Sequence, residues 1–254
     1  MPYYNSLEIK AREHLKYVEA SFPDLIDAAI KETKVYGYPD YIPPSRQAAS
    51  GCITLVETDS VSAAAERVSA GEKICILNFA SYKHPGGAFL EGSSAQEEAL
   101  CHESILYPVL QAFKDTYYEW NNRHKNGALY TNRALYTPDV LFIHKGEQFK
   151  ADVVTCAAPN VNTAVRYGHA TREQNNEVFA DRIKFLNDVI ADNCPDVVIV
   201  GAWGCGVFGQ DASFTAETML RQMRPVGRMV YAVPKGYNHR AFSEVFAAGR
   251  LNER

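Results

Sequence analysis

Two glycine-rich turns, each placed between a short apolar run and an amphipathic one, constrain the fold of this chain most. The first turn covers residues 84–98 and follows the apolar run 74–80. The second covers residues 201–210 and follows the apolar run 197–200. A glycine-rich turn between a strand and a helix lets backbone N–H groups approach a phosphate or a sugar closely. The pattern therefore favours an α/β protein with a binding site for such a ligand.

Strand-like and helix-like segments alternate from residue 51 onward, which is typical of an α/β sandwich with a mostly parallel or mixed central sheet. The expected strands are 53–57, 73–80, 140–144, 152–158, 196–202 and 228–233. The expected helices are 60–70 (capped by Asp59 or Ser60), 99–110, 172–193, 213–223 and 239–248. Because ligands of open α/β sheets bind beyond the carboxyl ends of the strands, we expect both glycine-rich turns at a binding site.

The first 50 residues differ from the rest of the chain. Apolar residues at helical spacing predict one or two amphipathic helices within 5–35, and these are Leu7, Ile9, Leu15, Val18, Leu25, Ile26, Ile30 and Val35. The proline-rich stretch 37–44 then interrupts regular structure. We therefore predict a helical N-terminal extension, residues 1–50, that packs on a main domain of residues 51–254.

Composition indicates the environment of the chain. The formal net charge of −4 gives no global basic field, so we expect neither direct nucleic-acid binding nor membrane binding. The N-terminus lacks the apolar core of a signal peptide, and no apolar stretch reaches the roughly 18 residues of a membrane helix. Six cysteines are scattered without a C-x-x-C pair, and Cys75 and Cys156 lie in strand-like runs. These features predict a cytoplasmic protein without disulfides.

The second turn contains the spacing of a dinucleotide-binding fingerprint. Gly204, Gly206 and Gly209 match G-x-G-x-x-G between a strand and a helix. The next strand, 228–233, has no acidic residue at its end to hold ribose hydroxyls, which disfavours a nicotinamide-dependent oxidoreductase. The remaining interpretations are a cradle of N–H groups for a diphosphate and a tight turn without a ligand. Phe208 fits a core anchor and a stacking platform equally well.

Two other residues invite a catalytic interpretation. Cys205 lies at the sharp turn after a strand, but Trp203 and Val207 break the G-x-C-x-G pattern of an exposed nucleophile. His84 is a candidate metal ligand or general base, but the seven histidines lack the spacing of a metal site. We expect no catalytic cysteine, no metal site and no cofactor.

Glu97 and Glu98 form an acidic pair beside the first glycine-rich turn, at the start of a helix. Successive helical residues point about 100° apart, so one carboxyl can reach a leaving-group oxygen while the other contacts neighbouring hydroxyls. This layout suits glycosidic bond cleavage with a single proton donor. Because a helix N-terminus lowers carboxyl pKa values, such a donor needs burial or a neighbouring negative charge. Acids in a first turn also serve as simple dipole complements, but Gln96 and the turn before it favour a site.

Together these residues resemble the microbial-type poly(ADP-ribose) glycohydrolases, which have the macrodomain fold. The family signature is a Gly-Gly-Gly loop followed by Gln-Glu-Glu. Here residues 86–88 are Gly-Gly-Ala, and after seven further residues 96–98 are Gln-Glu-Glu. Residues 200–209 are similar to the family's diphosphate loop, and 78–80 and 158–160 are similar to its strand ends.

The resemblance covers most of residues 51–254 and implies a three-layer, macrodomain-like sandwich after the helical extension. It implies an enzyme that cleaves ribose–ribose bonds of poly(ADP-ribose) from chain ends. Glu98 would protonate the leaving ribose oxygen and then act as base on the attacking water, while Glu97 would hold the ribose hydroxyls. The implied ligand contacts are Asn78, Gly86, Gly87, Ala88, Gln96, Gly204, Cys205, Gly206, Val207 and Phe208. The implied partners are poly(ADP-ribose) or ADP-ribosylated protein as substrate and ADP-ribose as product, with no metal or cofactor.

Two residues depart from the family pattern. Ala88 stands where the family usually has a third glycine, and a positive φ at that position would add strain of about 1 kcal/mol or more. Gln210 stands where asparagine is common. The alternatives are a non-catalytic ADP-ribose reader and a hydrolase of mono-ADP-ribosylated side chains or O-acetyl-ADP-ribose. A reader has no need of the adjacent acids Glu97 and Glu98, which favours an enzyme.

Overall fold

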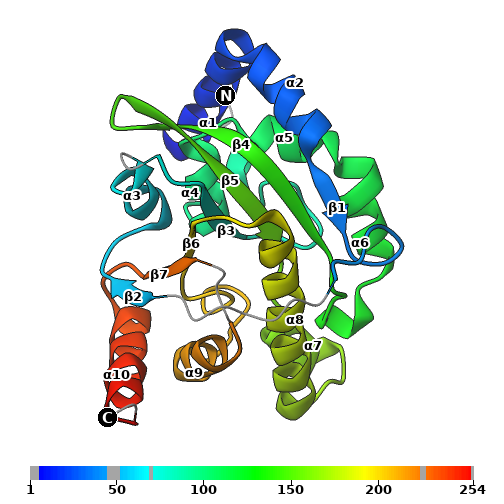
Figure 1. The fold of residues 1–254 in the computed structure, drawn as a ribbon. Helices are drawn as coiled ribbons and strands as arrows, with labels where there is room; N and C mark the ends of the chain where they lie inside the picture. The colour runs from blue at the N-terminus through cyan, green and yellow to red at the C-terminus, as the bar shows by residue number, and fades with distance from the viewer. Residues whose placement is uncertain (1–5, 45–51, 69–70, 224–226, 253–254) are drawn as a thin grey trace.

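The computed structural model describes residues 6–44, 52–68, 71–223 and 227–252, and a mixed seven-stranded sheet forms its centre (Figure 1). The strands are β1 (Lys34–Tyr36), β2 (Ile53–Val56), β3 (Ile74–Phe79), β4 (Ala134–His144), β5 (Glu147–Cys156), β6 (Val197–Val200) and β7 (Arg228–Ala232). Their order across the sheet is β1-β4-β5-β3-β6-β7-β2. Strands β5, β3, β6, β7 and β2 run parallel, whereas β4 pairs antiparallel with β1 and β5.

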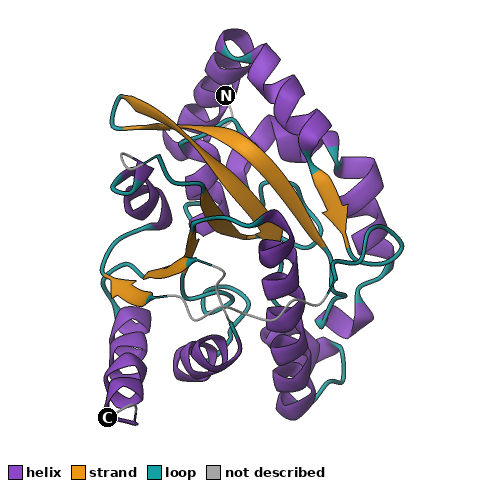
Figure 2. Cartoon of the chain, viewed as in Figure 1, coloured by secondary structure: helices purple, strands orange, loops and turns teal. Residues whose placement is uncertain are grey.

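Helices cover both faces of this sheet (Figure 2). They are α1 (Ser6–Ser21), α2 (Pro23–Glu32), α3 (Ser60–Ala65), α4 (Gln96–His102), α5 (Leu106–Ala112), α6 (Glu119–Arg123), α7 (Val161–Tyr167), α8 (Arg172–Asn193), α9 (Ala212–Gln222) and α10 (Tyr237–Asn252). Helices α1 to α5 contribute to one large buried cluster and α8, α9 and α10 to a second one on the opposite face. The predicted three-layer α/β sandwich is therefore confirmed.

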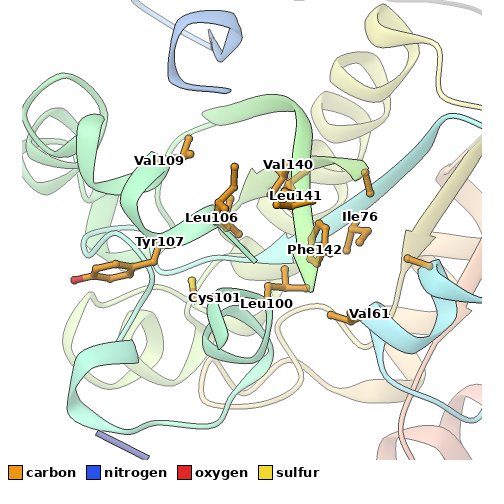
Figure 3. Packing of buried hydrophobic residues seen from close by; sticks show 14 of the residues in the cluster. Val61, Ile76, Leu100, Cys101, Leu106, Tyr107, Val109, Val140, Leu141 and Phe142 are labelled. Atoms are coloured by element: carbon orange, nitrogen blue, oxygen red, sulfur yellow. The ribbon is translucent and has the colours of Figure 1, made fainter. Parts of the chain in front are cut away.

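The central strands supply side chains to both clusters in alternation. In β3, Ile76 belongs to the first cluster, while Cys75 and Leu77 belong to the second. Figure 3 shows Ile76 in the first cluster near Leu100 of α4 and Phe142 of β4. Strands covered on both faces have continuous apolar sequences, which is why the runs at β3 and β6 were recognisable as buried strands.

The N-terminal segment adds an edge strand to the sheet. Helix α2 ends at Glu32 because Thr33 has an extended backbone (φ −66°, ψ 129°), and the Thr33 hydroxyl donates to Ala29 O at 2.6 Å. Val35, which was expected on a helix, instead lies in β1 opposite Leu135 of β4. The proposed boundary at residue 50 falls outside the described residues.

The expected helix 99–110 is wrong in one respect, because the structure divides it into α4 and α5. The ring of Pro108 would clash with the carbonyl group of Ser104 in a continuous helix, so a new helix begins just before the proline. The residues between the two helices pair with β4 instead. Ile105 N–H donates to Leu141 O (3.1 Å) and Ile143 N–H donates to Glu103 O (2.7 Å).

Other boundaries also differ from the expected ones. Asp59, one of the two expected caps, begins α3, and its Oδ1 accepts a hydrogen bond from Ser62 N–H at 2.8 Å. The α-helix ends at Ala65, and a tighter turn follows in which Arg67 N–H donates to Ala64 O. Strands β4 and β5 are both longer than expected because a two-residue hairpin turn at 145–146, with φ of 51° and 88°, joins them.

Candidate active site

A pocket of about 800 Å³ lies at the carboxyl ends of the parallel strands. It is lined by residues 59–61, 79, 81, 87–88, 93–100, 158, 202–204, 206–208 and 232–238. Both glycine-rich turns therefore border the same cavity. The walls formed by 59–61 and 232–238 were not singled out from the sequence, although their position just after β2 and β7 could have indicated them.

Gln96 fixes the start of α4 against the end of β3. Its Oε1 accepts from Phe79 N–H (2.8 Å), and its Nε2 donates to Leu77 O (2.9 Å) and to Ser60 Oγ (3.2 Å). The side-chain amide thus pairs with the backbone of β3 as a neighbouring strand would. This anchorage sets where the two following glutamates lie.

Glu97 is a buried carboxyl group, 3% exposed, in the wall of the pocket. Its Oε2 accepts from Ser81 N–H (2.7 Å) and its Oε1 from Asn78 Nδ2 (3.3 Å). Burial raises the pKa of Glu97 to about 8; the hydrogen bonds from Ser81 and Asn78 oppose this rise, and the charge of Glu98 adds to it. Glu97 therefore keeps its proton to a higher pH than an ordinary carboxyl group does.

Glu98 is buried as well, with 6% of its surface exposed. Its Oε1 accepts from Ala88 N–H at 2.9 Å, which ties α4 to the first glycine-rich turn. Gly87 has a φ of +60°, and a β-carbon at Gly87 would overlap Oε1 of Glu98 and approach Oε2 of Glu97 to 3.1 Å. Only glycine lets the turn come this close to both carboxyl groups.

Ala88 has a φ of −109° and a ψ of 40°, so it does not adopt the left-handed conformation. The turn places that conformation at Gly86 (φ 69°) and Gly87 (φ 60°) instead. The backbone strain that a positive φ would cause in an alanine is therefore absent, because the φ of Ala88 is negative. The Ala88 side chain lines the pocket.

Two buried side chains of the second turn, Trp203 and Gln210, fix it to neighbouring elements. Trp203 donates from Nε1 to Cys156 O (3.0 Å) at the end of β5. Gln210 donates from Nε2 to Pro159 O (2.8 Å) and exchanges two amide hydrogen bonds with Asn175 of α8 (3.0 Å each). Gln210 is thus an anchor of the turn. A β-carbon at Gly206 would meet nothing within 4 Å, so this side of the turn is open.

Three residues expected to contact a ligand do not line the pocket. Asn78 is fully buried behind Glu97, and Gly86 lies against the ring of Tyr107. Cys205 packs against the second cluster, and burial raises the pKa of its thiol to about 11, which does not suit a nucleophile. His84 is exposed outside the pocket, where its backbone N–H donates to Ser81 Oγ.

Within the described ranges, no group of three or more His, Cys, Asp or Glu side chains is placed to hold a metal ion. All six cysteines are free. Among residues 6–44, 52–68, 71–223 and 227–252, no helix has the length and apolar character needed to cross a membrane.

Comparisons with known proteins agree on one family. Residues 7–145, more than half of the chain, match the family described as microbial-type PARG, catalytic domain. The fold is similar to the crystal structure of poly(ADP-ribose) glycohydrolase (PARG) from Thermomonospora curvata, with a TM-score of 0.85, 27% identity, and coverage of 95% of this chain and 99% of that chain. The same protein bound to the inhibitor ADP-HPD gives a TM-score of 0.81, 26% identity, and coverage of 94% and 98%.

PARG from Deinococcus radiodurans in complex with ADP-ribose is also similar, with a TM-score of 0.75, 27% identity, and coverage of 88% of this chain and 97% of that chain. No curated protein sequence matches this chain.

Proposed function

Because this chain belongs to the microbial-type PARG catalytic-domain family, we propose that it hydrolyses the ribose–ribose glycosidic bonds of poly(ADP-ribose) and releases ADP-ribose. One observation carries the proposal. Two adjacent buried carboxyl groups, Glu97 and Glu98, lie against a glycine turn inside a pocket that a second glycine-rich turn borders. A binding module would have no use for two desolvated acids beside a sugar.

In the proposed reaction Glu98 is the general acid. It donates its proton to the leaving ribose oxygen as the bond from that oxygen to the anomeric carbon breaks, which leaves an oxocarbenium-like sugar. A water molecule then attacks the anomeric carbon and gives a proton to Glu98, so the acid is restored. The hydrogen bond from Ala88 N–H holds Oε1 of Glu98, and no described residue donates a hydrogen bond to its other oxygen.

Glu97 orients the ribose by accepting hydrogen bonds from its hydroxyl groups. Contact with these donors stabilises the ionised form of Glu97. Asn78 acts through Glu97, because its Nδ2 donates to that carboxyl group and its side chain is fully buried. The proposed role of Asn78 is therefore to position Glu97.

The two turns hold the rest of ADP-ribose. The backbone around Gly87 and Ala88 lies against the ribose and the diphosphate, and the backbone of residues 204–207 supplies N–H groups for the diphosphate. Phe208 packs on the sugar. The complexes of similar proteins with ADP-ribose and with ADP-HPD support a ligand of this size. Release from chain ends and a cytoplasmic location stay predictions.

The experiment is to incubate the protein with poly(ADP-ribose) and, separately, with mono-ADP-ribosylated protein, and to measure free ADP-ribose by chromatography. We expect release from the polymer. Release from the mono-ADP-ribosylated protein alone would instead indicate a mono-ADP-ribosyl hydrolase. Tight binding of ADP-ribose without release from either substrate would indicate a reader.

A further inference from the structure

A row of three aromatic rings runs from Tyr82, two residues before the first glycine-rich turn, to Phe208 in the second turn. The rings of Tyr82 and Tyr130 are stacked, with centroids 4.1 Å apart and planes at 11°. Tyr130 also meets Phe208 edge to face at 6.1 Å. Tyr82 and Tyr130 are only 1% and 5% exposed, and they form a third buried cluster, against which Phe208 packs. The buried residues of this cluster belong to neither of the two that cover the sheet, and Phe208 packs against the second of those two as well.

The Tyr82 end of the row is fixed to the side of the pocket that carries the acids. The Tyr82 hydroxyl donates to His124 O (3.0 Å) and lies 2.7 Å from Thr131 Oγ1, and Asn121 Nδ2 donates to Tyr82 O (3.0 Å). The preceding residue, Ser81, donates its N–H to Glu97. Tyr82 is therefore fixed at its hydroxyl and at its backbone, next to a residue that contacts α4.

Tyr130 is held in place by an unusual backbone turn. Asn126, Gly127, Ala128 and Tyr130 have φ values of 45°, 59°, 69° and 63°. Non-glycine residues rarely adopt this left-handed conformation, and a run of them persists only when the surroundings impose it. The turn is held by hydrogen bonds from Tyr130 N–H to Lys125 O (3.0 Å), from Asn160 N–H to Ala128 O (3.0 Å) and from Arg182 Nη2 to Leu129 O (3.2 Å).

Phe208, at the other end of the row, is partly exposed and lines the pocket. Its carbonyl oxygen accepts from Asn162 N–H at 3.2 Å, which fixes its backbone, whereas Tyr130 is the aromatic ring that meets its side chain. We propose that Tyr130 is a positioning residue: its flat ring, seated between the fixed Tyr82 and the pocket-lining Phe208, holds the Phe208 ring in its ligand-binding position. The inference rests on the proposed function and specifies how one of its contacts is held.

The test replaces Tyr130 and measures the affinity for ADP-ribose by calorimetry, together with poly(ADP-ribose) hydrolysis. We expect Tyr130→Leu to raise the Kd about tenfold, because leucine fills space but offers no flat ring, and the Phe208 side chain must then be ordered on binding. Tyr130→Phe keeps the ring and is expected to bind within about twofold of wild type. Tyr167→Leu, at a tyrosine that is 70% exposed on α7, is the matched control and should change neither quantity.

A double-mutant cycle separates positioning from general support of the fold. If Tyr130 acts through Phe208, then Tyr130→Leu should raise the Kd of the Phe208→Leu variant by less than about twofold. Should Tyr130→Leu fail to fold, Tyr130→Met offers an unbranched side chain that adapts to irregular space, and it is expected to weaken binding similarly.

Three results would overturn the inference: wild-type affinity in the folded leucine or methionine variant, an equal loss in Tyr130→Phe, or an undiminished loss in the Phe208→Leu background. Wild-type protein that binds ADP-ribose without cleaving the polymer would contradict only the proposed function.

Discussion

Glu97 and Glu98 follow one another in sequence yet have different surroundings. Glu97 accepts hydrogen bonds at both oxygens from residues at the end of β3, whereas Glu98 accepts one from the glycine turn. The 100° between successive residues of a helix produces this division, because the two side chains leave α4 toward different neighbours. The structure thus gives each acid the environment that its separate proposed role needs.

The role of Glu98 predicts the effect of removing its proton. Glu98→Gln keeps the size of the side chain but cannot supply the proton to the leaving oxygen, so we expect release of ADP-ribose from the polymer to fall by about 100-fold or more. The Kd for ADP-ribose should stay within about tenfold, a change of about 1.4 kcal/mol. Glu91→Gln, at an exposed acid of the same turn, is the control. Turnover at the wild-type rate in Glu98→Gln would remove Glu98 from the mechanism.

The raised pKa of Glu97 predicts how stability depends on pH. Since burial raises the pKa of Glu97 from an ordinary 4.5 to about 8 in the folded state, the folded protein binds more protons than the unfolded one between these values. The free energy of unfolding should therefore fall as pH rises from about 4.5 to about 8. Glu97→Gln cannot ionise and should lack this component. Denaturant titrations of both proteins at pH 5 and pH 8 measure the difference, and equal pH dependence in the two would contradict the assignment.

At the level of elements, the two glycine turns differ in what their glycines do. Gly87 makes room for protein atoms, because a side chain there would displace the carboxyl groups, whereas Gly206 borders open space in the pocket. The sequence marks both positions in the same way, as glycines between a strand and a helix. Only the neighbours of each α-carbon separate a glycine needed for assembly from one that leaves room for a ligand.

This difference predicts distinct outcomes for the same substitution. The Gly206→Val variant should fold normally, because no atom lies within 4 Å of the new β-carbon and the φ of Gly206 is not positive. We nevertheless expect the Kd for ADP-ribose to rise by about tenfold or more, which corresponds to about 1.4 kcal/mol. Gly87→Val should also lower thermal stability. Gly249→Val, on the exposed side of α10, is the control. Calorimetric titration that finds unchanged affinity in Gly206→Val would refute the placement of the diphosphate beside it.

The elements that the sequence revealed are those whose signal is local. Helix α8 was expected at its observed bounds, 172–193. Its start has a local signal in the sequence, because Thr171 and Gln174 form a capping box there. The edge strand β1 is too short to show a period, and it forms because β4 offers a free edge. The separation of α4 from α5 was foreseeable from Pro108, but their pairing with β4 depends on residues about 40 positions away.

At the scale of the whole molecule, the site depends on the parallel strands ending together. Helix α4, which carries Glu97 and Glu98, follows β3, and the second turn follows β6. These two strands are adjacent in the sheet although more than 100 residues separate them in sequence. Sequence motifs located both turns because glycine and acidic residues have strong local signals. The walls at 59–61 and 232–238 could be inferred only from their position after β2 and β7. The stacking of Tyr82 on Tyr130 arises from tertiary packing, so composition and spacing could not reveal it.

The packing of the N-terminal helices gives a prediction about the molecule as a unit. Val18 of α1 and Ile26 of α2 are buried in the first cluster. The same cluster contains Phe89 of the first glycine-rich turn and Leu100 of α4. Burial of each such aliphatic side chain contributes about 1.5–3 kcal/mol, against a net stability of about 5–15 kcal/mol for a domain. Deletion of residues 1–36, which also removes β1 from the edge of β4, should therefore abolish cooperative unfolding and ADP-ribose binding. Tyr17→Ser, at a side chain 49% exposed on α1, should leave both unchanged. A truncated chain that keeps the wild-type melting temperature and affinity would instead show that the extension is an independent unit.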